Sequence, residues 1–187
     1  MTALTDSLAE GAIQAILEAG ELLTDPAAVQ SIRSKGETDY VTNVDVAVQA
    51  FLRERLAALA PDVQFMGEEQ DNTGLDWSRP CWILDPVDGT MNLVHGFRHS
   101  AVSLALADRG QVELGLVYDP YAGELFSARR GGGAFVNGEP IHVSGAKRLA
   151  DCLVDVGTNP SQREAADRTF RCLRAVYDRC HDIRRVG

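Results

Sequence analysis

Short runs of β-forming residues follow one another from the middle of the chain to its last quarter, and they constrain the fold more than any other feature. Turn-forming residues separate them, among them Asp108–Gln111 and Asn137-Gly138. The runs are Val63–Met66, Cys81–Leu84, Ala101–Ala107, Val112–Tyr118, Glu124–Ala128, Ala134–Val136, Ile141–Val143 and Leu153–Val156. Because tight turns join antiparallel neighbours, this pattern predicts a mostly antiparallel, mixed sheet.

Three stretches with apolar residues at helical spacing flank these runs. They cover residues 4–24, Val46–Leu59 and Ser161 to about Cys180. Asp45 stands where the second helix would take its N-cap, and Ser161 stands at the start of the third. We therefore expect an α/β chain of the layered α+β type, with helices packed on a sheet. Its 187 residues correspond to about one domain, at roughly 150 residues per domain.

Composition excludes several classes of protein. The chain has 18 Lys and Arg against 27 Asp and Glu, a formal net charge of −9. This balance argues against nucleic acid as a substrate and against sequence-independent binding to it, because such binding requires basic side chains against phosphates. No run approaches the roughly 20 apolar residues of a bilayer span, and the N-terminus lacks the basic cluster of a signal peptide. We expect a cytoplasmic protein with no membrane contact, whose four cysteines are reduced thiols.

The segment from Cys81 to Asn92 carries the strongest chemical signal. An apolar run ends abruptly in Asp85, and Pro86 predicts a turn there because proline cannot continue a sheet ladder. Asp88 and Gly89 follow, and the next residues can open a helix whose free N–H groups would face a phosphate. Two neighbouring carboxylates repel each other in an empty site. A hard cation such as Mg²⁺, which prefers oxygen ligands, would relieve that repulsion.

An Asp-Gly pair taken alone is more typical of an ordinary turn. Other carboxylates strengthen the functional interpretation, because Asp45 and Glu68 also stand at the ends of predicted elements. Glu68 follows one β run just as Asp85 follows the next. If those two strands are neighbours, the carboxylates converge at one edge of the sheet, where such sheets usually bind ligands.

Several motifs, in chain order, resemble those of the inositol monophosphatase family. Residues Trp82–His95 resemble its signature, Gly67–Glu69 its upstream Gly-Glu-Glu, and Val41–Asp45 its threonine and aspartate element. A fourth match is Gly131–Gly138, and the resemblance runs from about Ser34 to the last residue. It implies the family's αβαβα sandwich and a Mg²⁺-dependent phosphomonoesterase that acts on a small phosphorylated polyol or sugar. It also implies a homodimer.

The resemblance further implies a set of metal ligands. Glu68, Asp85 and the backbone carbonyl of Val87 would hold the first Mg²⁺. Asp85 would bridge to a second ion, with Asp88 as a further ligand, and the site would take two or three ions in all. Paired metals of this kind stabilise both the entering and the leaving oxygen of an in-line displacement.

The remaining site residues would act on water and substrate. By the same resemblance, Asp45 and Thr90 would orient and deprotonate the attacking water, with no covalent phosphoenzyme. The turn Val87–Thr90, which includes Gly89, would bind the substrate phosphate. Gly187 would be the first residue of a substrate-contacting turn.

The resemblance also bears on the extent of the chain. Family members continue past the position of Gly187 into a C-terminal portion, and an aspartate of a Trp-Asp motif in that portion completes the second metal site. We therefore expect residues 1–187 to form the N-terminal portion, about two thirds, of one phosphatase-like domain. The loss of one anionic ligand would weaken the second metal site.

Three alternatives remain open. A strand-end Asp-x-Asp-x-Thr would indicate an aspartyl-phosphate phosphatase, but Asp85 and Asp88 are three positions apart rather than two. A catalytically silent binding or regulatory protein on the same scaffold is a second alternative, because the expected second metal site is incomplete. A relative of the fructose-bisphosphatase or histidinol-phosphatase type is the third.

Overall fold

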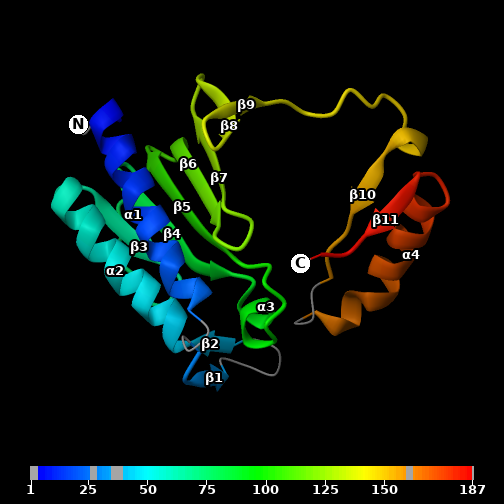
Figure 1. Ribbon diagram of the computed structural model, residues 1–187, viewed down its shortest axis with the longest axis horizontal. Helices are drawn as coiled ribbons and strands as arrows, with labels where there is room; N and C mark the ends of the chain where they lie inside the picture. Colours follow the sequence, from blue (N-terminus) through cyan, green and yellow to red (C-terminus); the bar gives the residue numbers. More distant parts are fainter. Residues whose placement is uncertain (1–3, 26–28, 35–39, 159–161, 187) are drawn as a thin grey trace. The chain divides into compact units, whose positions relative to one another are not determined.

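The computed structural model describes residues 4–25, 29–34, 40–158 and 162–186. Its contacts divide the chain into two compact units, one of residues 1–33 and 41–141 and the other of residues 34–40 and 142–187. Each unit combines helices with a sheet (Figure 1). The expected fold class, helices layered on a mixed sheet, is therefore confirmed.

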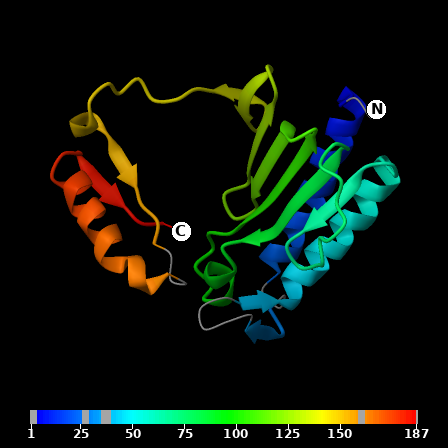
Figure 2. The same cartoon turned by 180° about the vertical axis from the view of Figure 1, so that it is seen from behind.

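A seven-stranded sheet forms the body of the first unit (Figures 1 and 2). Its strands are β3 (Gln64–Gly67), β4 (Cys81–Asp88), β5 (Ala101–Asp108), β6 (Gln111–Asp119), β7 (Glu124–Arg129), β8 (Gly133–Val136) and β9 (Glu139–Ile141). They lie side by side in chain order. The pair β3–β4 is parallel, and every later pair is antiparallel, as the turn pattern predicted.

Helices α1 (Asp6–Thr24) and α2 (Asn43–Leu59) cover one face of this sheet, as both views show (Figures 1 and 2). The core lies between the two layers. Ile16 of α1, Leu52 of α2, and Leu104 and Leu116 of the sheet are each at most 1% exposed. Burial of this apolar face is what holds α2 against the sheet, and α2 carries part of the candidate site.

The prediction of a turn at Pro86 is wrong, because β4 continues through the proline to Asp88. Asp85 pairs with Ser103 of β5, whereas Asp88 pairs with Ala101, so β4 uses one more residue than β5 over this stretch. The extra residue forms a β-bulge. A bulge tolerates proline because it breaks the ladder locally and needs no amide donor there.

Two other predicted boundaries also shift. Asp45 is not the N-cap of α2. Thr42 caps the helix, and Asp45 lies in its first turn. The strand predicted at Ile141–Val143 lies earlier, as β9, from Glu139 to Ile141. It starts at Glu139 because Asn137 and Gly138, both with positive φ, form the tight turn of a hairpin directly before it. Ser161 lies outside the described residues.

The second unit contains β10 (Leu153–Asp155) paired in parallel with β11 (Asp182–Arg184), together with α4 (Ala166–Tyr177). Two 3₁₀ turns, Leu149–Asp151 and Arg163–Ala165, precede β10 and α4 respectively. A separate two-stranded sheet joins β1 (Ile32–Ser34) to β2 (Tyr40–Thr42). Within the described part of the chain, no helix is long and apolar enough to span a bilayer.

Candidate active site

The start of α2 places Asp45 in a buried, fully hydrogen-bonded position. Thr42 caps the helix by accepting a hydrogen bond from the Val44 N–H at 3.1 Å. The Asp45 carboxylate reaches back to Thr42, accepting from its N–H at 2.8 Å and from its hydroxyl at 2.6 Å. This is a reciprocal capping box, and it holds a carboxylate that is only 2% exposed. The positive end of the helix dipole also favours a negative charge there.

Thr90 joins this carboxylate to the end of β4. It is the first residue of the short helix α3 (Thr90–Val94). Its hydroxyl lies 3.1 Å from Oδ1 of Asp45 and 3.0 Å from the carbonyl oxygen of Val87. The structure thus brings together the two residues expected to act on water. The hydroxyl has one proton and two acceptors within reach, so it can donate to either.

The parallel pairing of β3 with β4 brings Glu68 beside Asp85. Gly67 stands opposite Leu84 in the register, and the Glu68 N–H donates to the Leu84 carbonyl at 3.3 Å. The next residues along the two strands are therefore Glu68 and Asp85. The expected convergence of strand-end carboxylates at one sheet edge is confirmed for this pair.

The carboxyl of Asp85 lies in a strongly perturbing environment. Burial, reinforced by the negative charges of Glu68 and Asp88 and by a hydrogen bond with Glu68, raises its pKa from 3.8 to about 7. One opposing contact is the Val87 N–H, which donates to Oδ1 of Asp85 at 3.1 Å. The negative charge concentrated here is therefore poorly compensated by the protein alone.

The turn from Val87 to Thr90 places the other expected residues. The side chain of Val87 is buried in the core, while its carbonyl faces Thr90. Asp88 is exposed at the end of β4. Gly89 has φ +90°, a left-handed conformation that favours glycine, and α3 starts directly after it, as predicted. Gly187, the last expected substrate contact, lies outside the described residues.

Three further residues hold this site and were not predicted. Thr42 carries the capping box, which the sequence Thr42-Asn43-Val44-Asp45 signals through its threonine and aspartate three positions apart. The Ser100 hydroxyl, buried, donates to the Gly89 carbonyl at 2.9 Å. Gln49 accepts a hydrogen bond from the Glu69 N–H at 2.9 Å. Its spacing of four residues from Asp45, hence its place on the same helix face, was the available signal.

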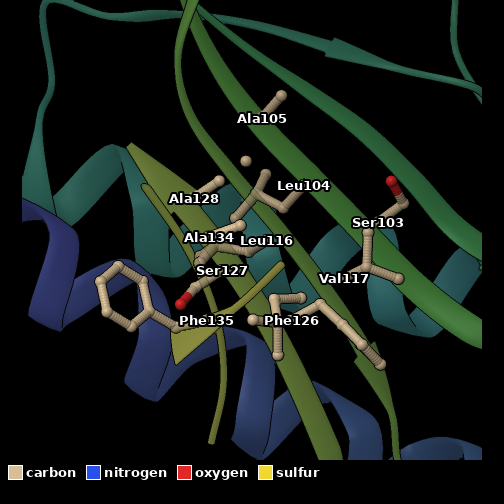
Figure 3. Close-up of a pocket in the computed structure, with 12 residues that line it drawn as sticks. Ser103, Leu104, Ala105, Leu116, Val117, Phe126, Ser127, Ala128, Ala134 and Phe135 are labelled. Atoms are coloured by element: carbon tan, nitrogen blue, oxygen red, sulfur yellow. The ribbon is translucent and has the colours of Figure 1, made fainter. Parts of the chain in front are cut away.

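Neither of two hollows in the first unit is lined by an expected metal or catalytic residue. A hollow of about 250 Å³ is lined by Thr42, Asn43 and Glu69 together with Arg33, Val41 and Val46. A second hollow, of about 280 Å³, lies across strands β5 to β9 and is shown in Figure 3. It is mainly apolar, and none of the expected metal or catalytic residues lines it. Its nearest link to the site is Ser103, the register partner of Asp85.

The donor set suits a hard divalent cation. Glu68, Asp85 and Asp88 offer carboxylate oxygens, and the Val87 carbonyl retains a second lone pair beside the bond from Thr90. A cation would offset the repulsion that raises the pKa of Asp85. Over the residues that the structure describes, no three His, Cys, Asp or Glu side chains already converge as a metal cage. Carboxylates without a cation between them repel one another. The assignment of these residues as metal ligands stays a prediction.

Comparison with known proteins agrees with this fold. The sequence pattern of the inositol monophosphatase family matches residues 4–187. An inositol-1-monophosphatase of Rhizobium meliloti is 37% identical, over 94% of this chain and 67% of its own length. A Nus factor SuhB of Xylella fastidiosa is 35% identical, over 82% of this chain and 55% of its own length. The chain therefore spans 67% of the length of the first relative and 55% of the length of the second.

Solved structures show the same likeness. The extragenic suppressor protein suhB of Bartonella henselae superposes with a TM-score of 0.91 at 34% identity, over 97% of this chain and 71% of that one. An IMPase of Thermotoga maritima gives a TM-score of 0.85 at 32% identity, over 98% and 69% of the two chains. The fold is that of the inositol monophosphatases. The chain belongs to the inositol monophosphatase family.

Proposed function

We propose that this chain carries the site of a Mg²⁺-dependent phosphomonoesterase that hydrolyses a small phosphorylated polyol or sugar. The observation that carries the proposal is the position of the Thr90 hydroxyl, 3.1 Å from the buried carboxylate of Asp45 and 3.0 Å from the Val87 carbonyl. It joins a proton acceptor on α2 to the strand end that holds Asp85 and Asp88. A hydrolase of this kind needs two functions side by side: a route for the water proton and a place for the cation that would neutralise the anionic phosphate.

In this proposal Thr90 and Asp45 move the proton of the attacking water. Thr90 donates its hydroxyl proton to Oδ1 of Asp45, which leaves the Thr90 oxygen free to accept a proton from water. The water oxygen forms a bond to phosphorus as the ester P–O bond breaks, and the departing alkoxide takes a proton from solvent. The products are inorganic phosphate and the free alcohol.

The capping box restricts the direction of this relay. Oδ2 of Asp45 is engaged by the Thr42 N–H and hydroxyl, so Oδ1 is the oxygen that faces Thr90. Glu68, Asp85, Asp88 and the Val87 carbonyl would hold Mg²⁺, which when bound lowers the pKa of water and neutralises charge on the phosphate. In this proposal the first N–H groups of α3, which have no acceptors within the helix, would donate to the bound phosphate.

Phosphate release tests this proposal. Wild-type protein should release phosphate from inositol 1-phosphate with Mg²⁺ and not with a chelator, and Asp88→Asn should lose most of that activity. Asp62→Asn is the matched control, because Asp62 is an exposed aspartate that precedes β3, at the opposite end of that strand from Glu68. Equal activity in wild type and Asp88→Asn would refute the assignment of Asp88 as a metal ligand.

A binding or regulatory role is the second candidate, and a specific observation supports it. Some of the relatives are named Nus factor SuhB rather than phosphatase. Calorimetry with Mg²⁺ and inositol 1-phosphate, run beside the phosphate assay, separates the two. Binding without phosphate release would favour the regulatory role, whereas binding with release supports the phosphatase.

A further inference from the structure

The backbone around Glu68 is held at each of three successive residues. Asn72 brackets Gly67, accepting from its N–H at 3.2 Å and donating to its carbonyl at 2.7 Å. The Glu68 N–H donates to the Leu84 carbonyl in β4. The Glu69 N–H donates to Oε1 of Gln49 at 2.9 Å. Only the last of these bonds ties this segment to α2.

Gln49 is buried and hydrogen-bonded at this position. It is 8% exposed, although glutamine is usually a surface residue. A buried amide is retained at a cost unless it is hydrogen-bonded, and its Oε1 is used by Glu69. Gln49 also lies one helical turn after Asp45, so one face of α2 contacts both the Thr90 hydroxyl and the segment that bears Glu68.

Gly67 shows how closely this amide approaches the segment. A Cβ added at Gly67 would lie 2.3 Å from Oε1 of Gln49 and 2.6 Å from its Cδ. The absence of a side chain at Gly67 therefore lets the Gln49 amide reach past it to the Glu69 N–H. The amide and the segment leave each other little freedom to shift.

We propose that Gln49 is a positioning residue that fixes Glu68 beside Asp85, and so couples the Asp45 face of α2 to the cation site. The inference rests on the proposed function, because it assigns Glu68 to a Mg²⁺ site. In this proposal Gln49 would not itself be a ligand of the cation. Removal of its acceptor oxygen frees the Glu69 N–H and lets Glu68 move away from Asp85. Loss of a contact that orients a metal ligand typically lowers metal affinity by about 10- to 100-fold.

The test compares variants of the whole chain in two measurements, Mg²⁺ affinity by calorimetry and hydrogen exchange of the Glu69 amide without Mg²⁺. Gln49→Met keeps the length of the side chain and removes the acceptor, whereas Gln49→Glu keeps the acceptor. Gln64→Met is the matched control, because Gln64 accepts from the Asp76 N–H at 2.9 Å and donates to the Asp76 carbonyl at 2.8 Å, at the other end of β3.

We expect Gln49→Met to weaken Mg²⁺ binding by about tenfold and to speed exchange at Glu69. Gln49→Glu and Gln64→Met should keep the wild-type exchange rate at Glu69 and bind Mg²⁺ no more weakly than wild type. Should Gln49→Met not fold, Gln49→Asn shortens the side chain by one methylene and should shift both measurements in the same direction.

Wild-type Mg²⁺ affinity in Gln49→Met would overturn the proposal. An equal loss in Gln64→Met would do so too, because it would reveal general destabilisation. Failure of the proposed function has a different signature: the wild-type chain itself would bind no Mg²⁺. In that case the exchange rate at Glu69 would still report whether Gln49 holds the segment.

Discussion

The hydroxyl of Thr90 lies 3.1 Å from Oδ1 of Asp45, although 45 positions separate the two residues in the chain. One belongs to the start of α2 and the other to the start of α3, so the contact depends on how α2 packs on the sheet. The same hydroxyl reaches the Val87 carbonyl at 3.0 Å. This side chain therefore connects the helix layer to the strand end that carries Asp85.

Replacement of Thr90 should separate the proton relay from simple packing. Thr90→Val keeps the shape of the side chain and removes the hydroxyl, so we expect kcat to fall by about 10²- to 10⁴-fold, the range typical of a lost acid–base group. Thr90→Ser keeps the hydroxyl and should retain most of the activity. Steady-state phosphate release with saturating Mg²⁺ is the measurement. Equal losses in the two variants would contradict a role for the hydroxyl.

Removal of the cap of α2 should lower both stability and activity. Thr42→Ala deletes the hydroxyl that caps the helix and that donates to Asp45 at 2.6 Å. Loss of an N-cap costs about 1 kcal/mol, which for a chain of this size lowers Tm by roughly 2–4 °C. Oδ2 of Asp45 loses one of its two donors, so we also expect a lower kcat.

Thr5 provides the control for this experiment. It caps α1 by the same chemistry, accepting from the Leu8 N–H at 3.1 Å, and α1 carries none of the expected site residues. Thr5→Ala should show a similar fall in Tm with unchanged kcat. The measurements are Tm by calorimetry and kcat by phosphate release, made on Thr42→Ala and Thr5→Ala. A parallel loss of kcat in Thr5→Ala would show that activity merely follows stability.

The turn at Gly89 should tolerate no side chain. A Cβ there would lie 3.0 Å from the His99 carbonyl, in a left-handed conformation with φ +90°. Gly138 has a similar φ of +85° with nothing within 4 Å of its Cβ position. Both Gly→Ala variants should lose roughly 1–2 kcal/mol of unfolding free energy. Only Gly89→Ala should lower kcat/KM, by about 10²-fold if the phosphate turn shifts by about 1 Å. Matching kcat/KM values would contradict this.

Much of the site followed from local patterns in the sequence. Glu68 and Asp85 each follow a β run, so the sequence predicted their convergence on the condition that the two strands are neighbours. The parallel pairing of β3 with β4 meets that condition. The start of α3 after Gly89 was likewise predicted from a local glycine signal. The roles assigned to these residues toward Mg²⁺ and phosphate stay predictions.

What the sequence did not predict depends on contacts between distant segments or on a competing local rule. Gln49 meets the amide of Glu69, which lies 20 positions further along the chain, only because α2 packs on the sheet. Pro86 was expected to end a strand, yet a bulge absorbs it because Asp88 pairs again with β5. The N-cap of α2 was predicted three residues too late, at Asp45 instead of Thr42. An aspartate before an apolar helix face is itself a good N-cap, and this signal outweighed the threonine three residues before it.

The pH dependence of Asp85 provides a last prediction, for the chain without Mg²⁺. Burial and the charges of Glu68 and Asp88 raise its folded-state pKa to about 7, against 3.8 as the ordinary value. Between these two values the folded chain binds more protons than the unfolded chain, so unfolding free energy falls as pH rises. The contribution of the protonated carboxyl is complete below about pH 4 and is lost as pH rises through about 7.

Asp85→Asn keeps the shape of the side chain and removes this titration. With a chelator at pH 8 we expect it to be more stable than wild type by about 1 kcal/mol, or roughly 2–4 °C in Tm, after allowance for solvent screening. The difference should vanish by about pH 4. Excess Mg²⁺ should reverse the order, because the cation binds the charged carboxylate of the wild type. Asp62→Asn should show no such reversal. A lower Tm for Asp85→Asn in chelator at pH 8 would contradict uncompensated charge at Asp85.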